Sequence, residues 1–133
     1  MVKFPVKKPV ALPVVLNIGM QKHYLARRRE ILESAGFEVC DATDARQAVT
    51  LCRQKAPHIA IFGHLLPVAE RLQMAEALRA VNSALRIVVM YDRSASKTEH
   101  ADAVLQIDVP PADLVHSIEY LLDGNTAPGR TAS

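Results

Sequence analysis

The amino-acid sequence predicts an α/β fold, a five-stranded parallel sheet of the doubly wound kind with helices on both faces. Short runs rich in β-branched residues alternate with longer segments of helical periodicity along most of the chain. This alternation favours parallel strands joined by right-handed crossovers. The length of 133 residues suits one domain, and an apolar fraction of 50% with 23% charged residues indicates a chain that folds.

Five short runs are predicted to be strands. The first, third and fourth contain continuous apolar stretches, which are typical of strands buried on both faces of a parallel sheet. In chain order the runs are Val14–Ile18, Phe37–Cys40, His58–Phe62, Arg86–Met90 and Ala103–Ile107.

Four segments are predicted to be helices. The first, Gln21–Ala35, is followed by Gly36, and Arg28 interrupts its apolar stripe. The other three carry apolar side chains three and four positions apart, so each has one face for the core. They are Ala45–Cys52, Val68–Val81 and a last helix, Asp113–Leu122, which ends before Gly124.

The composition excludes several classes of protein. A formal net charge of +2 is too small to indicate a polyanionic partner. Cys40 and Cys52 lie in apolar surroundings and match no zinc or redox spacing, so we expect buried, reduced thiols. No apolar run approaches the roughly 20 residues of a membrane span, and no secretion signal is recognisable. We therefore expect a cytoplasmic protein that makes no membrane contact.

The predicted domain covers residues 13–124. Residues 1–12 contain Pro5 and Pro9 among lysines, which indicates a flexible N-terminal lead-in. Residues 125–133 are mostly small and polar and have little to bury, so we expect a disordered C-terminal tail.

Two segments carry a family resemblance. Glu30–Val39 (EILESAGFEV) and Ala56–Pro67 (APHIAIFGHLLP) resemble the receiver domain of bacterial two-component response regulators. The spacing of strands and helices agrees with that family from about Val14 to Leu122. The resemblance implies a flavodoxin-like, receiver-like fold, in which binding chemistry lies at the carboxyl ends of the strands.

The resemblance also implies a phosphorylation site that this sequence lacks. Receivers bind Mg²⁺ through an acidic pair after the first strand and accept a phosphoryl group on an aspartate after the third. Gly19 and Met20 stand at the positions of the acidic pair, and Gly63 stands at the position of the aspartate. Tyr91 replaces the family's serine or threonine, and Ile107 replaces its lysine. We therefore expect a degenerate pseudo-receiver without catalytic residues.

The segment after the fourth strand is also unusual for the family. Eleven residues separate Tyr91 from Ala103, several fewer than receivers place there. Asp92–Thr98 is polar and has no apolar stripe, so we expect the family's fourth helix to be shortened or replaced by a loop. We also expect the Tyr91 ring to fill the vacated pocket, near Gly63 and Met20.

Three further residues near strand ends, His64, Asp92 and Asp108, are candidates for a different ligand or metal site. A single histidine at such a rim more often forms an ordinary hydrogen bond, and two carboxylates from separate loops are few ligands for a metal. We expect neither a metal nor a cofactor.

Arg27, Arg28 and Arg29, with Lys22, form a basic cluster on the first predicted helix. Consecutive side chains point in different directions around a helix, so part of the cluster must lie along the core boundary and the rest in solvent. No aromatic residues interleave with the arginines and no helix-turn-helix follows, so we expect no nucleic-acid binding.

The leading hypothesis is a phosphorylation-independent signalling module, not an enzyme, that binds a protein partner or itself in a two-component-type pathway. The predicted interaction surface is Asp113–Leu122 with the strand and loop before it. One alternative is a small-ligand or metal sensor that uses the crevice at the strand ends. A second is a conventional phosphorelay receiver.

Overall fold

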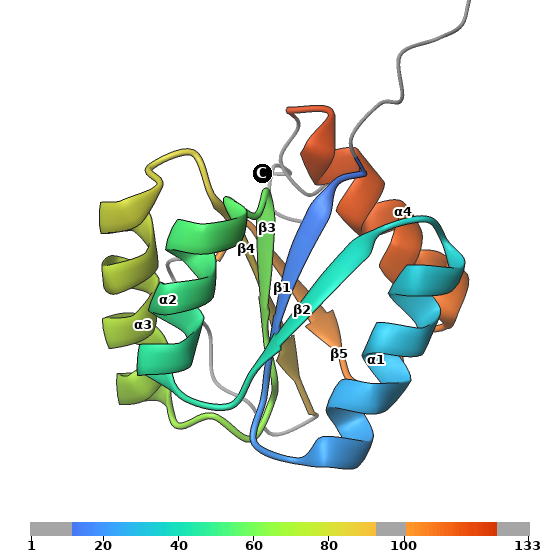
Figure 1. The fold of residues 1–133 in the computed structure, drawn as a ribbon. Coiled ribbons are helices and arrows are strands. Elements are labelled where there is room, and N and C mark those ends of the chain that lie inside the picture. The colour runs from blue at the N-terminus through green and yellow to red at the C-terminus, as the bar shows by residue number, and fades with distance from the viewer. Residues whose placement is uncertain (1–11, 93–100, 125–133) are drawn as a thin grey trace, which may run out of the picture.

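A computed structural model describes residues 12–92 and 101–124 of the chain. All five predicted strands are present and pair in parallel in the order β2-β1-β3-β4-β5. Helices α1 and α4 cover one face of the sheet, and α2 and α3 cover the other (Figure 1). The predicted α/β class is confirmed. The elements are β1 (Val14–Ile18), α1 (Lys22–Ser34), β2 (Glu38–Ala42), α2 (Ala45–Lys55), β3 (Ile59–Phe62), α3 (Val68–Val81), β4 (Arg86–Tyr91), β5 (Ala103–Gln106) and α4 (Pro111–Leu122).

The sheet separates two layers of apolar packing. On the side of α2 and α3, Leu16 and Phe62 pack with Leu78 of α3. On the side of α1 and α4, Val15 and Ile61 belong to a second cluster, which includes buried residues of both helices. Neighbouring residues of a strand point to opposite faces, so both layers need apolar side chains and the central strands are apolar throughout.

Some element boundaries differ from the sequence-based expectation. β2 begins at Glu38, one residue later than predicted, and extends to Ala42, because Asp41 and Ala42 continue the pairing with β1. The last helix begins two residues earlier than predicted, at Pro111, since a proline fits the first turn of a helix. Ile107 follows β5 rather than ending it.

The start of β5 is attached to its neighbours by one side chain. Asp102 accepts a hydrogen bond from the backbone N–H of Ile87 at 2.7 Å and from Arg79 Nη2 at 2.9 Å. This carboxylate therefore joins the edge strand both to β4 and to the end of α3.

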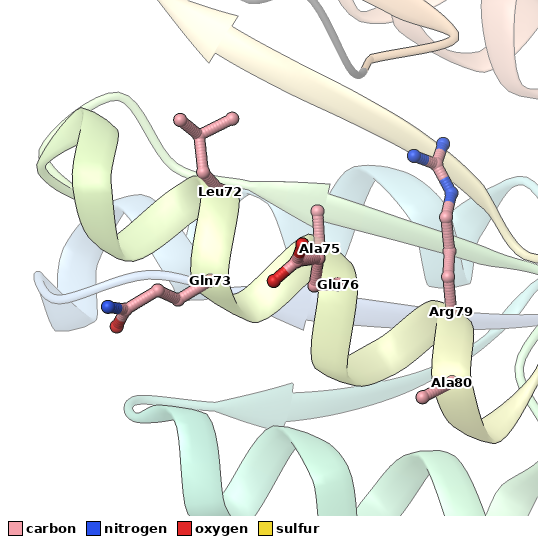
Figure 2. Close-up of a pocket in the computed structure, with 6 residues that line it drawn as sticks. All are labelled: Leu72, Gln73, Ala75, Glu76, Arg79 and Ala80. Atoms are coloured by element: carbon pink, nitrogen blue, oxygen red, sulfur yellow. The ribbon is translucent and has the colours of Figure 1, made fainter.

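Beside α3 lies a hollow of about 570 Å³, whose described lining residues all belong to that helix. Figure 2 shows Leu72 and Arg79 projecting from the same side of the helix. Leu72 is 38% exposed. The expected loop at Asp92–Thr98 falls mostly outside the described residues, as do the predicted lead-in, apart from Leu12, and the predicted tail.

Both cysteines are buried and unbonded to each other, as expected. Burial raises the pKa of the Cys40 and Cys52 thiols, which favours the neutral form. Within residues 12–92 and 101–124, no helix combines the length and apolar character needed to span a membrane.

Two leucines of α3 provide a test of the layered core. Leu78 is fully buried whereas Leu72 is 38% exposed. We expect Leu78→Ala to lower the free energy of unfolding by about 2–5 kcal/mol, because it removes buried methyl groups and leaves a cavity. Leu72→Ala is expected to cost less than about 1 kcal/mol. Urea denaturation followed by circular dichroism measures both, and equal losses would contradict this packing.

Candidate functional site

The five positions that match the family's phosphorylation site come together at one edge of the sheet. Gly19 and Met20 follow β1, Gly63 follows β3, Tyr91 ends β4 and Ile107 follows β5. Backbone hydrogen bonds continue the sheet past its strands, from Gly63 N–H to the Ile18 carbonyl at 2.8 Å and from Ile107 N–H to the Tyr91 carbonyl at 2.8 Å. All five positions therefore lie at the carboxyl edge of the sheet.

The side chain that reaches into this edge is Arg28, from the second turn of α1. Its Nη2 lies 3.3 Å from the point where a Cβ on Gly19 would stand, and 3.5 Å from the same point on Gly63. Arg28 is only 7% exposed. The two glycines thus leave the space into which a guanidinium extends.

Arg28 is held in place by two hydrogen bonds from its guanidinium. Nε donates to Oδ1 of Asn17 at 2.9 Å, and Nη2 donates to the backbone carbonyl of Ile18 at 3.1 Å. Both acceptors belong to β1, so the end of the central strand and the middle of α1 are fixed to each other.

Asn17 extends this contact into a network. Its side chain is fully buried, and its Nδ2 donates to the Leu25 carbonyl and to Oδ1 of Asp41, both at 3.0 Å. The other oxygen of Asp41 forms an ion pair with Nη1 of Arg29 at 3.0 Å. The network therefore runs from α1 through β1 and β2 and back to the exposed face of α1.

The charge of Arg28 is poorly compensated. Burial lowers the pKa of Arg28 to about 10, and the nearby Asp41 carboxylate opposes this shift. The guanidinium is still a cation at neutral pH. Among the carboxylates that the structure describes, none forms an ion pair with Arg28, since Asp41 pairs with Arg29.

The Tyr91 ring was expected to fill the space next to Gly63, but the atoms nearest to Gly63 belong to other residues. The three heavy atoms nearest to a Cβ on Gly63 are the Ile18 carbonyl oxygen, Gly19 Cα and Arg28 Nη2. Tyr91 is half-buried, and Met20 is 57% exposed. The nearest side chain to Gly63 is therefore Arg28, which extends from α1, and not the expected Tyr91.

His64 lies close to this edge and is half-buried. Its ring meets the Tyr24 ring edge-on, with 4.7 Å between the centroids. Burial lowers the pKa of His64, Asp92 raises it and Arg28 lowers it further. His64 therefore lies within electrostatic reach of both Asp92 and Arg28.

The alternative metal site is not assembled. Asp108 is exposed, in the turn after β5. In the described part of the chain, no three histidine, cysteine, aspartate or glutamate side chains come together in a way that could hold a metal ion. His64, Asp92 and Asp108 therefore do not form a coordination sphere.

A small cavity lies between α1, the end of β3, β4 and the start of α4. Its volume is about 30 Å³, which is enough for one or two water molecules or one small ion. Its polar lining comes from two arginines, a tyrosine and a histidine, and the rest is apolar. The lining residues are Tyr24, Arg27, Arg28, Ile31, His64, Met90, Ile107, Val109 and Leu114.

Two residues of this site, Asn17 and Arg28, were not identified as functional candidates from the sequence. The available signals were an amide within the otherwise apolar run Val14–Ile18 and a cation within the apolar stripe of the first helix. Each signal by itself fits a surface residue. Only the crossing of α1 over β1 shows that they satisfy each other.

Comparison with known proteins identifies the fold. A receiver domain from Methanospirillum hungatei superposes with a TM-score of 0.76, 22% sequence identity and coverage of 86% of this chain and 96% of that one. A LuxR-family response regulator from Aurantimonas sp. superposes with a TM-score of 0.75 and 23% sequence identity, over 88% of this chain and 89% of that one. Chemotaxis protein CheY4 of Vibrio cholerae superposes with a TM-score of 0.73 and 19% sequence identity, over 82% of this chain and 98% of that one. The chain has the receiver fold.

Sequence comparison agrees with this assignment. The transcriptional regulatory protein PrrA of Mycobacterium tuberculosis is 29% identical over 126 residues, and the PrrA of Mycobacterium bovis matches equally. The match covers 89% of this chain and 54% of each PrrA, so the chain spans about half the length of these curated relatives. No protein-family model matches the chain.

Arg28 and the exposed Arg53 form a matched pair for testing the network. Arg28→Ala leaves Asn17 Oδ1 without its donor and removes one of the two donors to the Ile18 carbonyl, so we expect it to lower the free energy of unfolding by about 2–4 kcal/mol. Arg53 of α2 is exposed, and Arg53→Ala is expected to change stability by less than about 0.5 kcal/mol. Urea titrations at one pH and ionic strength measure both. Similar values for the two variants would show that the network contributes little.

Proposed function

We propose that this chain is a receiver-fold module that signals without phosphorylation, by contact with another protein in a two-component-type pathway. The observation that supports the proposal is the identity of the residues at the carboxyl edge of the sheet. Where the family's pattern needs three carboxylates, this chain has Gly19, Met20 and Gly63. Neither glycine offers a nucleophile or a metal ligand, and a thioether is a poor ligand for a hard cation such as Mg²⁺.

The electrostatics of the edge support the same conclusion. A divalent cation bound there would lie beside the Arg28 guanidinium, and like charges at such distances repel strongly in a partly buried site. In the receiver family, a bound Mg²⁺ neutralises a cluster of carboxylates at this edge. Here a positive charge of the protein occupies the edge, so a metal ion has neither ligands nor a favourable field.

The outer side of the molecule at β5 and α4 supplies the proposed interaction surface. Leu114, Ile118 and Leu121 of α4 are buried in the core, so the opposite side of the helix faces outward. Tyr120 is 39% exposed on that side, and Val104 of the edge strand β5 is 38% exposed. Aromatic side chains are frequent anchors of protein interfaces, which favours Tyr120 as the centre of a contact with a protein partner or a second copy.

Phosphotransfer is tested directly by incubation of the chain with acetyl phosphate and Mg²⁺. We expect intact-mass spectrometry to find only the unmodified chain, because no carboxylate stands at position 63. A conventional receiver treated in parallel is the positive control. A phosphoryl adduct on this chain would contradict the proposal, and tandem mass spectrometry would then locate the acceptor.

The interaction surface is tested by charge substitution. Tyr120→Glu is expected to weaken self-association or partner capture by about tenfold or more, as loss of an interface anchor does. Val68→Glu is the matched control, since Val68 is 43% exposed on the α3 side of the molecule. Light scattering over a range of concentrations and cross-linking in extract provide the measurements. A chain that stays monomeric and cross-links to no partner would contradict the proposal.

A further inference from the structure

The cavity of about 30 Å³ beside Arg28 has a composition that suits a negatively charged occupant. Arg27 and Arg28 both line it, with His64 and Tyr24 as further polar groups. None of its described lining residues is a carboxylate, and the nearby Asp92 acts on His64 from outside this lining. A guanidinium offers five N–H donors, and the hydrogen bonds to Asn17 and Ile18 use two of them.

The local charge balance points in the same direction. Arg28 is buried, and the Asp41 carboxylate, whose charge it senses, lies across Asn17 and is paired with Arg29. A buried charge is costly unless it is paired. The edge of the sheet therefore carries a cation that lacks a direct counter-ion among the described side chains.

We propose that this cavity is a binding site for one small monovalent anion, of the size of chloride or nitrate, held by Arg28 with Arg27 and His64. The volume limits the occupant, because a space for one or two water molecules excludes nucleotides and organic phosphates. The apolar part of the lining removes water from the anion and so strengthens its attraction to the guanidinium.

Such an anion would stabilise the contact between α1 and the carboxyl edge. Arg28 comes from α1, whereas His64 follows β3 and Ile107 follows β5, so the bound ion would contact groups on both sides of the cavity. The proposal does not depend on phosphorylation-independent signalling, since a phosphorylated chain could also bind chloride. The two proposals therefore succeed or fail separately.

The experiment is thermal unfolding in chloride at constant ionic strength, with bulky gluconate as the replacement anion. We expect Tm to rise by roughly 4–8 °C when chloride reaches about ten times its dissociation constant, because the ion binds the native state. Nitrate and bromide are expected to act similarly. An absent or equal response to all anions, gluconate included, would overturn the proposal.

Three variants locate the effect. Arg28→Gln removes the charge and is expected to abolish the chloride-dependent shift, whereas Arg53→Gln, an exposed arginine of α2, is expected to retain it. Because Arg28→Gln risks unfolding, Val109→Ile provides a second variant, in which one added methylene narrows the cavity with the arginine intact. It is expected to weaken the shift at least several-fold. An unchanged shift in Val109→Ile would place any binding elsewhere and overturn the assignment.

A direct measurement completes the test. Crystals soaked in bromide are expected to show an anomalous peak in the cavity, within hydrogen-bonding distance of the Arg28 guanidinium. Crystals without a peak there, at a bromide concentration that raises Tm, would overturn the site.

Discussion

The organisation of the carboxyl edge depends on the hydrogen bond from Arg28 Nε to Asn17 Oδ1, 2.9 Å long and buried between α1 and β1. A buried guanidinium is tolerated only where its donors are satisfied, and a buried amide only where both its oxygen and nitrogen are paired. Each of these side chains satisfies the other, so neither can be replaced alone without leaving a polar atom unpaired. This mutual requirement fixes the position of α1 over the end of the central strand.

Gly19 and Gly63 lie next to this contact and affect the space available to Arg28. The resemblance to receivers places them at positions where that family has carboxylates. As neighbours of Arg28 they provide space, because an added Cβ at either position would stand within 3.5 Å of its Nη2. A carboxylate at position 63 would also lie close to the Ile18 carbonyl, since a Cβ there would stand 3.2 Å from that oxygen. The two glycines and the arginine are therefore compatible with one another, because the glycines leave room for the guanidinium.

The sign of the charge at this edge determines whether it attracts cations or anions. A cluster of carboxylates attracts a divalent cation and through it a phosphoryl group. A buried guanidinium repels the cation and attracts anions, and it does so most effectively in a small cavity from which water is largely excluded. Under the proposal of an anion site, this edge of the sheet binds a different class of ligand from the one that clustered carboxylates bind.

The sequence by itself determined the sheet, the alternation of strands and helices, and the absence of carboxylates at positions 19, 20 and 63. These follow from local patterns, because apolar runs and helical stripes reflect burial on one or two faces. The sequence did not determine what occupies the vacant edge. Tyr91 was the expected occupant, whereas the nearest side chain to Gly63 is Arg28. Arg28 donates a hydrogen bond to Asn17, which lies eleven residues earlier in the chain. Only the tertiary structure decides this point, since a hydrogen bond between a helix and a strand depends on where α1 crosses β1, and no periodicity records that crossing.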